Sequence, residues 1–285
     1  MLELKDRLRN IGRNFALDKL RSRLGARVIP EPLNLVFMGN PGTGKTTVAR
    51  LFAAILKDIG MIAENKVVEV QRDDLVGVHI GSTEANTVQK IREAEGGILF
   101  IDEAYQLYRE GVSKNDFGAE AIGVIMKHLN QEDNRQLCKT VFILAGYERE
   151  MKHFMSANKG LFRRFREPVY FRDYSPIELG DIMTTLIRKQ GFSSEDQINW
   201  VDFFSSLPQS YLALFNGAIC NRAFVKIKEA MSERVLFGSI SREGLFQLSK
   251  DDVAKALAAL KIDAQFAEEK HLIDKSTQVE EGDFN

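Results

Sequence analysis

Cysteine and histidine are scarce in this 285-residue sequence, which holds two of the former and four of the latter. Cys138 and Cys220 lie far apart and form no C-x-x-C pair, so the sequence predicts neither a disulfide framework nor a structural zinc site. We therefore expect a reducing compartment, either the cytoplasm or the interior of an organelle such as a stroma.

Long apolar runs and an excess of one charge are also lacking. No run approaches the roughly 18 to 20 apolar residues that cross a bilayer, and the charged opening MLELKDRLRN is unlike a secretory signal. The net charge is −1 and the pI is near 6.5, so the chain lacks the strong positive field of a general nucleic-acid-binding protein. We expect no membrane partner and no nucleic-acid partner.

Apolar and helical segments alternate between residues 33 and 174. Five short apolar segments are typical of buried strands, namely 33–38, 66–70, 97–101, 140–145 and 168–171. Segments of helical spacing lie between them, at 47–59, 83–95, 117–131 and 149–155. Strands that alternate with helices predict an α/β domain whose parallel sheet is covered by helices on both faces.

The pattern changes after residue 174, where four stretches have helical spacing: 176–190, 195–206, 215–236 and 250–266. Ser175 before Pro176 is typical of a helix cap and first turn. We therefore predict four parts, which are a basic helical segment with a linker at Pro30 and Pro32 (1–32), an α/β core (33–174), a small helical domain (175–262) and an acidic, disordered tail (263–285).

Residues 39–46 read GNPGTGKT and match the phosphate-binding pattern G-x-x-x-x-G-K-[S/T] between a predicted strand and a predicted helix. Glycines let the backbone wrap closely around phosphates, and N–H groups at a helix start point toward negative charge. Lys45 would reach the β- and γ-phosphates, and Thr46 would offer its hydroxyl to Mg²⁺. The alternative is a glycine turn without a ligand. The predicted nucleotide-binding residues here are Gly39, Asn40, Pro41, Gly42, Thr43, Gly44, Lys45, Thr46 and Thr47.

Two adjacent carboxylates, Asp102 and Glu103, directly follow the apolar segment 97–101. A buried strand would deliver Asp102 to the Mg²⁺ shell, and Glu103 would orient or deprotonate the attacking water. The alternative is that both carboxylates cap the next helix. Glutamate after aspartate favours ATP hydrolysis over phosphoryl transfer to a small molecule, and GTP is disfavoured because the segment 158–161, NKGL, lacks the aspartate of the guanine-reading N-K-x-D pattern.

Arg163 and Arg164 stand just before the fifth predicted strand. An arginine at this place can reach from one subunit of a ring to the γ-phosphate held by the neighbouring subunit, where it would stabilise charge in the transition state. The alternative is a pair of surface arginines.

Five segments, taken in order, resemble the CbbX/CfxQ/SpoVK branch of the AAA+ ATPases, which includes the red-type Rubisco activases. They are GNPGTGKTTVAR, RDDLVGVHIG, GGILFIDEAYQLY, ILAGYEREM and FRDYSPIEL. The resemblance covers about residues 10–230. It implies ATP and Mg²⁺ as ligands, a homo- or hetero-oligomeric ring that is usually a hexamer, and a protein client pulled by loops that face the central pore.

The resemblance also implies roles for single residues. It gives the phosphate loop and the carboxylate pair the roles described above. Arg164 becomes the arginine finger because it precedes Phe165 in an L-x-x-R-F arrangement, and Arg163 is second. Tyr147 stands where many relatives place a polar sensor of the γ-phosphate.

Three departures from the family pattern affect the prediction. The predicted pore loop lacks the usual aromatic residue and consists of Val78, His79, Ile80 and Gly81. His79 could still grip a peptide or add pH sensitivity. The lid helix of relatives reads G-N-A-R, and Ala218 occupies the arginine position here, so Arg222, one turn further along the same face, is the predicted substitute. The chain also begins within a helix of its relatives, so we expect a piece of a longer protein or a shortened paralogue.

Three functions remain open on these grounds. The leading prediction is an ATP-driven ring motor that remodels a protein substrate. The departures at His79 and Ala218 favour instead a nucleotide-binding regulatory or scaffold subunit of a mixed ring. Red-type Rubisco activation would be a particular case of the first function.

Overall fold

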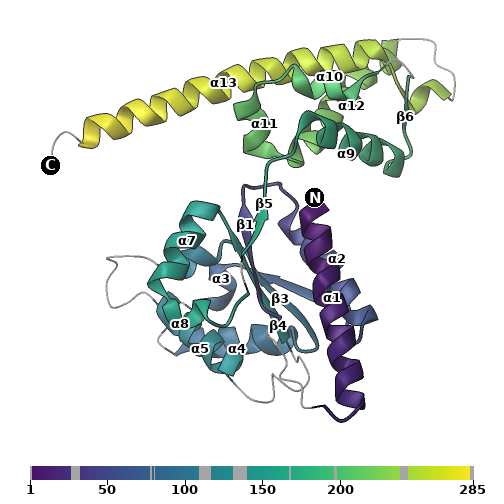
Figure 1. Cartoon of the computed structure of the whole chain (residues 1–285). Coiled ribbons are helices and arrows are strands. Elements are labelled where there is room, and N and C mark those ends of the chain that lie inside the picture. Colours follow the sequence, from purple (N-terminus) through teal and green to yellow (C-terminus); the bar gives the residue numbers. More distant parts are fainter. Residues whose placement is uncertain are drawn as a thin grey trace. The chain divides into compact units, whose positions relative to one another are not determined.

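The computed structural model describes residues 2–26, 33–77, 79, 81–108, 117–130, 140–166, 168–195, 198–237 and 243–282. The chain divides into two compact units (Figure 1). The N-terminal unit comprises Met1–Gly39 and Gly44–Phe171, and the C-terminal unit comprises Asn40–Thr43 and Arg172–Asn285. The middle of the phosphate loop therefore packs with the C-terminal unit, although the residues on either side of it belong to the other. Cys138 and the predicted linker at Pro30 and Pro32 lie outside the described residues.

A five-stranded parallel sheet forms the centre of the N-terminal unit, as the sequence predicts. Its strand order is β2-β3-β4-β1-β5, so β4 lies between β3 and β1. The strands are β1 (Leu35–Gly39), β2 (Val67–Val70), β3 (Gly97–Ile101), β4 (Thr140–Gly146) and β5 (Val169–Phe171). Because the strands are parallel, the residues that follow β1, β3 and β4 meet at one edge of the sheet.

Helices cover both faces of this sheet (Figure 1). One face packs against α1 (Leu2–Arg23) and α2 (Lys45–Asp58). The other face packs against α3 (Arg72–Leu75), α4 (Ser82–Glu93), α5 (Gly118–Asn130), α7 (Glu148–Ala157) and α8 (Lys159–Phe162). Neighbouring side chains of β3 show why this strand is continuously apolar. Phe100 faces the first layer and Leu99 the second, and both are fully buried.

The C-terminal unit is mainly helical. Its helices are α9 (Pro176–Lys189), α10 (Trp200–Ser205), α11 (Gln209–Phe215), α12 (Ala218–Phe237) and α13 (Lys250–Gly282). They share one apolar core that includes Leu179, Phe204, Ile219 and Leu260. Two short strands, β6 (Ser193–Ser194) and β7 (Gln247–Leu248), pair in parallel beside the helices. Ser175 caps α9 as predicted, because its Oγ accepts the Glu178 N–H at 3.3 Å.

The structure differs from the sequence prediction at three places in this unit. The helix predicted over 215–236 begins only at Ala218, because Asn216 has φ 49° and ψ −129°, which no helix accommodates. The helix predicted over 195–206 begins only at Trp200, where Asn199 Oδ1 accepts the Val201 N–H at 3.0 Å. The tail predicted to be disordered is helical as far as Gly282. Ala264, near the start of the predicted tail, is fully buried within α13. The alanine, lysine and glutamate residues of this segment have a high helix propensity, and this propensity favours a helix despite the negative charge of the segment.

Among the described residues, no helix combines the length and the apolar character needed to cross a lipid bilayer.

Candidate active site

The phosphate loop joins β1 to α2 and needs two of its glycines for close packing. A Cβ on Gly39 would collide with the carbonyl oxygen of Phe171 in the neighbouring strand. A Cβ on Gly42, whose φ is +70°, would collide with the carbonyl oxygen of Phe215. The sequence pattern predicts that these glycines contact phosphate. The structure adds that protein backbone already lies against them on one side.

Unpaired backbone donors make the loop suited to an anion. The N–H groups of Gly42, Thr43 and Gly44 make no hydrogen bond with any described part of the chain, although Thr43 is only 2% exposed. A buried N–H without a partner is costly, whereas successive N–H groups of a glycine-rich loop form a concave site for phosphate oxygens. The donor set therefore fits the phosphates of a nucleotide.

Lys45 adds positive charge at the start of α2. Its Nζ donates to the Gly39 carbonyl at 2.8 Å, which turns the side chain back over the loop. Burial lowers the pKa of Lys45, and the charges of Asp102 and Glu103 oppose that shift. The lysine therefore lies within electrostatic reach of both predicted catalytic carboxylates. Thr46 and Thr47 follow it in the first turn of α2, where Thr46 is half-buried and Thr47 exposed.

The carboxylate pair follows β3 at the same edge of the sheet. The Asp102 N–H donates to the Val70 carbonyl at 2.9 Å, and Asp102 Oδ1 accepts the Glu103 N–H at 3.0 Å. Glu103 has φ 49° and ψ 41°, a left-handed conformation that a non-glycine residue adopts at a cost of about 1 kcal/mol. Its Oε2 accepts a hydrogen bond from Gln106 Nε2. The helix-cap alternative fails for Glu103, whose side chain makes no cap hydrogen bond to the short helix Ala104–Leu107.

Two tyrosines lie beside Glu103. Tyr147 directly follows β4, and its ring centroid lies 5.9 Å from that of Tyr105. Burial raises the pKa of Tyr147, as do the charges of Glu103, Glu150 and Asp102. Burial and the Glu103 charge raise the pKa of Tyr105 to about 12. Tyr147 thus lies within electrostatic reach of Glu103 and Asp102, and its role as a sensor of the γ-phosphate stays a prediction. Sequence reasoning missed Tyr105, although it stands two residues after Glu103.

Comparison with known proteins identifies the family. The family described as "ATPase family associated with various cellular activities (AAA)" matches residues 35–173. Stage V sporulation protein K of Bacillus subtilis is 36% identical over 242 residues, which make up 84% of this chain and 73% of that protein. The chain belongs to the AAA family of ATPases.

Two other relatives of this AAA ATPase bear names from the predicted branch. A chloroplastic ribulose bisphosphate carboxylase/oxygenase activase of Cyanidioschyzon merolae is 43% identical over 66% of this chain and 63% of its own length. Protein CbbX of Cereibacter sphaeroides is 40% identical over 66% of this chain and 60% of its own length. The chain thus spans less than two thirds of these two relatives. The predicted membership of the CbbX/CfxQ/SpoVK type is confirmed, as are nucleotide binding and ATP hydrolysis.

The two predicted finger arginines of this AAA ATPase differ in their surroundings. Arg164 is half-buried, and its Nη1 donates to the Gly160 carbonyl. The Arg164 carbonyl in turn accepts from Asn34 Nδ2 at 3.2 Å. Arg163 is exposed, and its guanidinium makes no hydrogen bond or ion pair with the described part of the chain. The residue that the resemblance ranks second therefore has the more accessible guanidinium.

The predicted pore loop is only partly described. Val78 and Ile80 lie outside the described residues. His79 is exposed, and its backbone N–H donates to Ser82 Oγ at 3.2 Å while its carbonyl accepts from the same oxygen at 2.5 Å. Gly81, with φ 81°, precedes the first turn of α4. The turn is thus held to the start of α4, and the imidazole of His79 is presented to solvent.

Arg222, the predicted substitute sensor, is engaged elsewhere. Its Nη2 pairs with Asp263 Oδ2 at 2.9 Å, and its guanidinium lies 5.1 Å from the ring centroid of Phe215. The hydrogen bond that Arg222 donates to Asp263 raises the pKa of Arg222. The guanidinium therefore stabilises contact between α12 and α13, a role that the sequence did not indicate.

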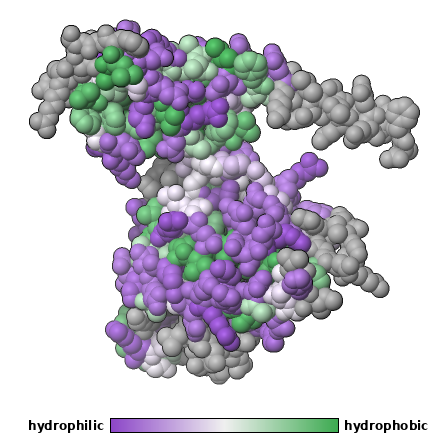
Figure 2. Space-filling view, turned by 180° about the vertical axis from the view of Figure 1, so that it is seen from behind, coloured by the Kyte–Doolittle hydropathy of each residue, from purple (hydrophilic) through white to green (hydrophobic). Residues whose placement is uncertain are grey.

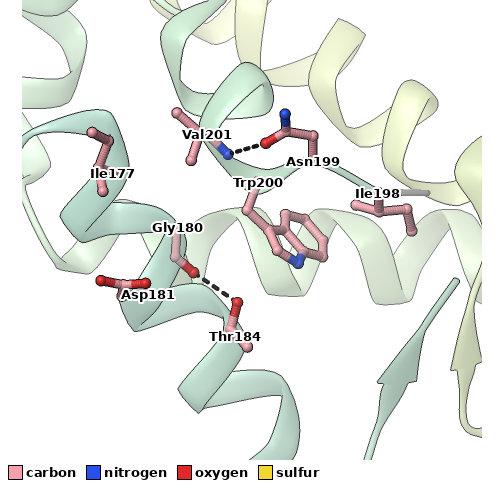
Figure 3. A pocket seen from close by; sticks show the side chains of 8 residues that line it. All are labelled: Ile177, Gly180, Asp181, Thr184, Ile198, Asn199, Trp200 and Val201. Atoms are coloured by element: carbon pink, nitrogen blue, oxygen red, sulfur yellow. Dashed lines mark hydrogen bonds between the residues drawn. The ribbon is translucent and has the colours of Figure 1, made fainter. Parts of the chain in front are cut away.

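A groove of about 410 Å³ between α9 and α10 lies outside the nucleotide site (Figure 3). Two of its polar groups bond within the protein, because Thr184 Oγ1 donates to the Gly180 carbonyl at 2.9 Å and the Val201 N–H donates to Asn199 Oδ1 at 3.0 Å. None of the residues around it belongs to the phosphate loop or the carboxylate pair. The groove does not contribute to the chemistry described here.

Proposed function

We propose that this AAA ATPase is a subunit of an ATP-driven ring that remodels a protein client. One observation carries the proposal, which is the meeting of unpaired loop N–H groups, Lys45 and the Asp102–Glu103 pair at one edge of the sheet. Similarity to the relatives named as stage V sporulation protein K, CbbX and ribulose bisphosphate carboxylase/oxygenase activase supports the proposal. A reducing compartment, the cytoplasm or an organelle stroma, belongs to the same proposal.

The residues divide the chemistry between them. The loop N–H groups and Lys45 bind the phosphates of ATP, and Thr46 and Asp102 would hold Mg²⁺ through oxygen atoms, which this ion prefers. Bound Mg²⁺ would neutralise phosphate charge. Glu103 accepts the proton of the attacking water at Oε1, because Gln106 occupies Oε2. The γ-phosphoryl group moves to water, and ADP leaves with the bond electrons. Tyr147 would sense the γ-phosphate.

Assembly would complete the site. An arginine of the adjacent subunit would stabilise charge in the transition state, and the exposed Arg163 is suited to reach outward. Figure 2 shows hydrophobic residues at the surface of both units. Large exposed apolar side chains include Leu51, Phe162, Leu214, Phe246 and Phe266. Single exposed apolar side chains are common on monomeric proteins as well, so the proposed ring, a hexamer, rests on the need for an arginine from the adjacent subunit.

The client is a protein that the exposed loop around His79 would contact. Ribulose bisphosphate carboxylase/oxygenase is one candidate, because a relative is named as its activase.

A second function, a regulatory or scaffold subunit of a mixed ring, is favoured by one observation. Ala218 carries no guanidinium and Arg222 is bound to Asp263, so this subunit would sense nucleotide through its lid only weakly.

Turnover measured against protein concentration tests the proposal. With Mg²⁺ present, we expect the rate per subunit to rise with concentration, because each site would need an arginine from its neighbour. Glu103→Gln should still bind ATP but lose at least about a hundredfold in turnover. A flat, negligible rate despite tight ATP binding would favour the regulatory subunit, and unchanged turnover in Glu103→Gln would remove Glu103 from the mechanism.

The arginine assignment needs a paired comparison. Arg163→Ala and Arg164→Ala are measured at a concentration where the unaltered protein is fully active. The finger variant should lose about a thousandfold in turnover and retain ATP binding. Full activity of Arg164→Ala together with an inactive Arg163→Ala would transfer the role to Arg163.

A further inference from the structure

Three hydrogen bonds tie the middle of the phosphate loop to two distant segments of the C-terminal unit, and a fourth joins those two segments to each other. The hydroxyl of Tyr174 donates to the Thr43 carbonyl at 3.0 Å, and the Gly217 N–H donates to the Gly42 carbonyl at 3.0 Å. Asp173 Oδ1 accepts from the side-chain amides of Asn40 and Asn216, each at 2.9 Å. All of these residues belong to the same compact unit.

The two carbonyl contacts determine where the loop N–H groups point. In a trans peptide the C=O of one residue and the N–H of the next point in opposite directions, and the chain has no cis peptide among its described residues. Because the Gly42 carbonyl points to Gly217, the N–H of Thr43 points the opposite way. Because the Thr43 carbonyl points to Tyr174, the N–H of Gly44 also points away. These two N–H groups are among the three of the phosphate loop that have no partner in the described chain.

The hydroxyl of Tyr174 stays protonated and so remains a hydrogen-bond donor. Burial raises its pKa, and the charge of Glu178 raises it further, so the hydroxyl keeps its proton at neutral pH. Gly217 lies directly against the tyrosine, since a Cβ built on it would come within 3.4 Å of the Tyr174 ring. The turn between α11 and α12 thus holds the ring and the backbone of Tyr174, whose N–H donates to Asn216 Oδ1 at 3.0 Å.

We propose that Tyr174 is a positioning residue for phosphate binding, whose hydroxyl, with the Gly217 N–H, fixes two loop carbonyls and thereby aims the N–H groups of Thr43 and Gly44 at the phosphates. The inference rests on the proposed nucleotide site and extends it. It assigns to a side chain 131 positions away from Thr43 in the sequence a share of nucleotide affinity. Tyr174 would act through the loop backbone, by way of its hydrogen bond to the Thr43 carbonyl.

Binding of ADP and of inorganic pyrophosphate to the full chain tests this proposal by calorimetry. Tyr174→Phe keeps the ring and removes only the hydroxyl. We expect its Kd for both ligands to rise about five- to tenfold, since the Thr43–Gly44 peptide loses one hydrogen bond. Tyr211→Phe is the matched control, because Tyr211 is a buried tyrosine of the same unit whose hydroxyl makes no hydrogen bond with the described phosphate loop. Its Kd values should stay within twofold.

Turnover separates positioning from general damage. Tyr174→Phe should raise KM for ATP and leave kcat within twofold, because the phosphates are held equally in the ground state and in the transition state. Equal Kd values for Tyr174→Phe and the unaltered protein would overturn the inference while leaving the nucleotide site intact. Equal weakening by Tyr211→Phe would also overturn it. Failure of the unaltered protein to bind ADP would overturn the proposed function as well.

Discussion

Replacement of Asn216 by alanine should destabilise the C-terminal unit more than any other single polar truncation at the turn between α11 and α12. The side chain is 1% exposed and makes three hydrogen bonds. Its Oδ1 accepts the Tyr174 N–H at 3.0 Å, and its Nδ2 donates to Asp173 Oδ1 at 2.9 Å and to the Ala213 carbonyl at 2.8 Å. A buried hydrogen bond contributes about 1 kcal/mol net. Asn216→Ala should therefore lower the free energy of unfolding by about 3 kcal/mol.

The backbone of Asn216 supplies an internal comparison. Its φ of 49° and ψ of −129° lie in a region that glycine adopts readily and that costs other residues about 1 to 3 kcal/mol. Asn216→Gly loses the same three hydrogen bonds but relieves this strain. Because glycine also adds conformational freedom to the unfolded chain, worth about 0.5 to 1 kcal/mol, we expect Asn216→Gly to be about 1 kcal/mol more stable than Asn216→Ala.

Trp200 makes the measurement selective. It is the single tryptophan of the chain and lies in the core of the C-terminal unit, so its fluorescence during urea unfolding reports on this unit. The free energies of unfolding of the two variants and of the unaltered protein are compared with one common value for the slope m, which relates the free energy to the urea concentration. A loss below about 1 kcal/mol in Asn216→Ala would refute the reasoning from hydrogen bonds. Equal losses in the two variants would refute the reasoning from backbone strain.

Three further predictions follow from single contacts. Asp252 is 1% exposed and accepts from Arg234 at 2.9 Å; burial alone would raise its pKa, but hydrogen bonds from Arg234 and Ser249 outweigh burial and lower it. The ionised Asp252 therefore contributes fully to the free energy of unfolding above its unfolded pKa near 3.9, and this contribution is lost as the pH falls through the lower folded pKa. Asp252→Asn should lower the free energy of unfolding at pH 7 by about 2 kcal/mol, as measured by urea unfolding, and should make stability less dependent on pH in the acid range. Gly42→Ala should weaken ADP binding at least about tenfold in calorimetry, since the φ of +70° and the Phe215 carbonyl both oppose a Cβ; unchanged affinity would contradict the packing described. Burial raises the pKa of Cys220 to about 12, so iodoacetamide at pH 8 should alkylate it only in urea, as mass mapping will show, and rapid alkylation of the folded protein would contradict its burial.

Local pattern accounts for most of the α/β fold. Strands such as 97–101 are predictable because every residue is apolar, which is what burial on both faces requires. Asn216 shows where local pattern fails. The spacing of its apolar neighbours favours a helix that runs through it, whereas its side-chain hydrogen bonds to Asp173, Tyr174 and Ala213 stabilise the break. Arg222 likewise has helical neighbours that place it near Ala218, but its partner is Asp263 on another helix.

The sequence by itself determined the chemistry of the candidate site. Lys45 and Thr46 follow a strand and begin a helix, and Asp102 and Glu103 end another strand, so covalent order and the geometry of parallel sheets bring them to one edge. Only the tertiary structure decided what holds the phosphate loop. The hydrogen bond from Tyr174 to the loop joins residues 131 positions apart, and periodicity carries no information about such pairs, because it reports which face of an element is buried and not which loop meets which.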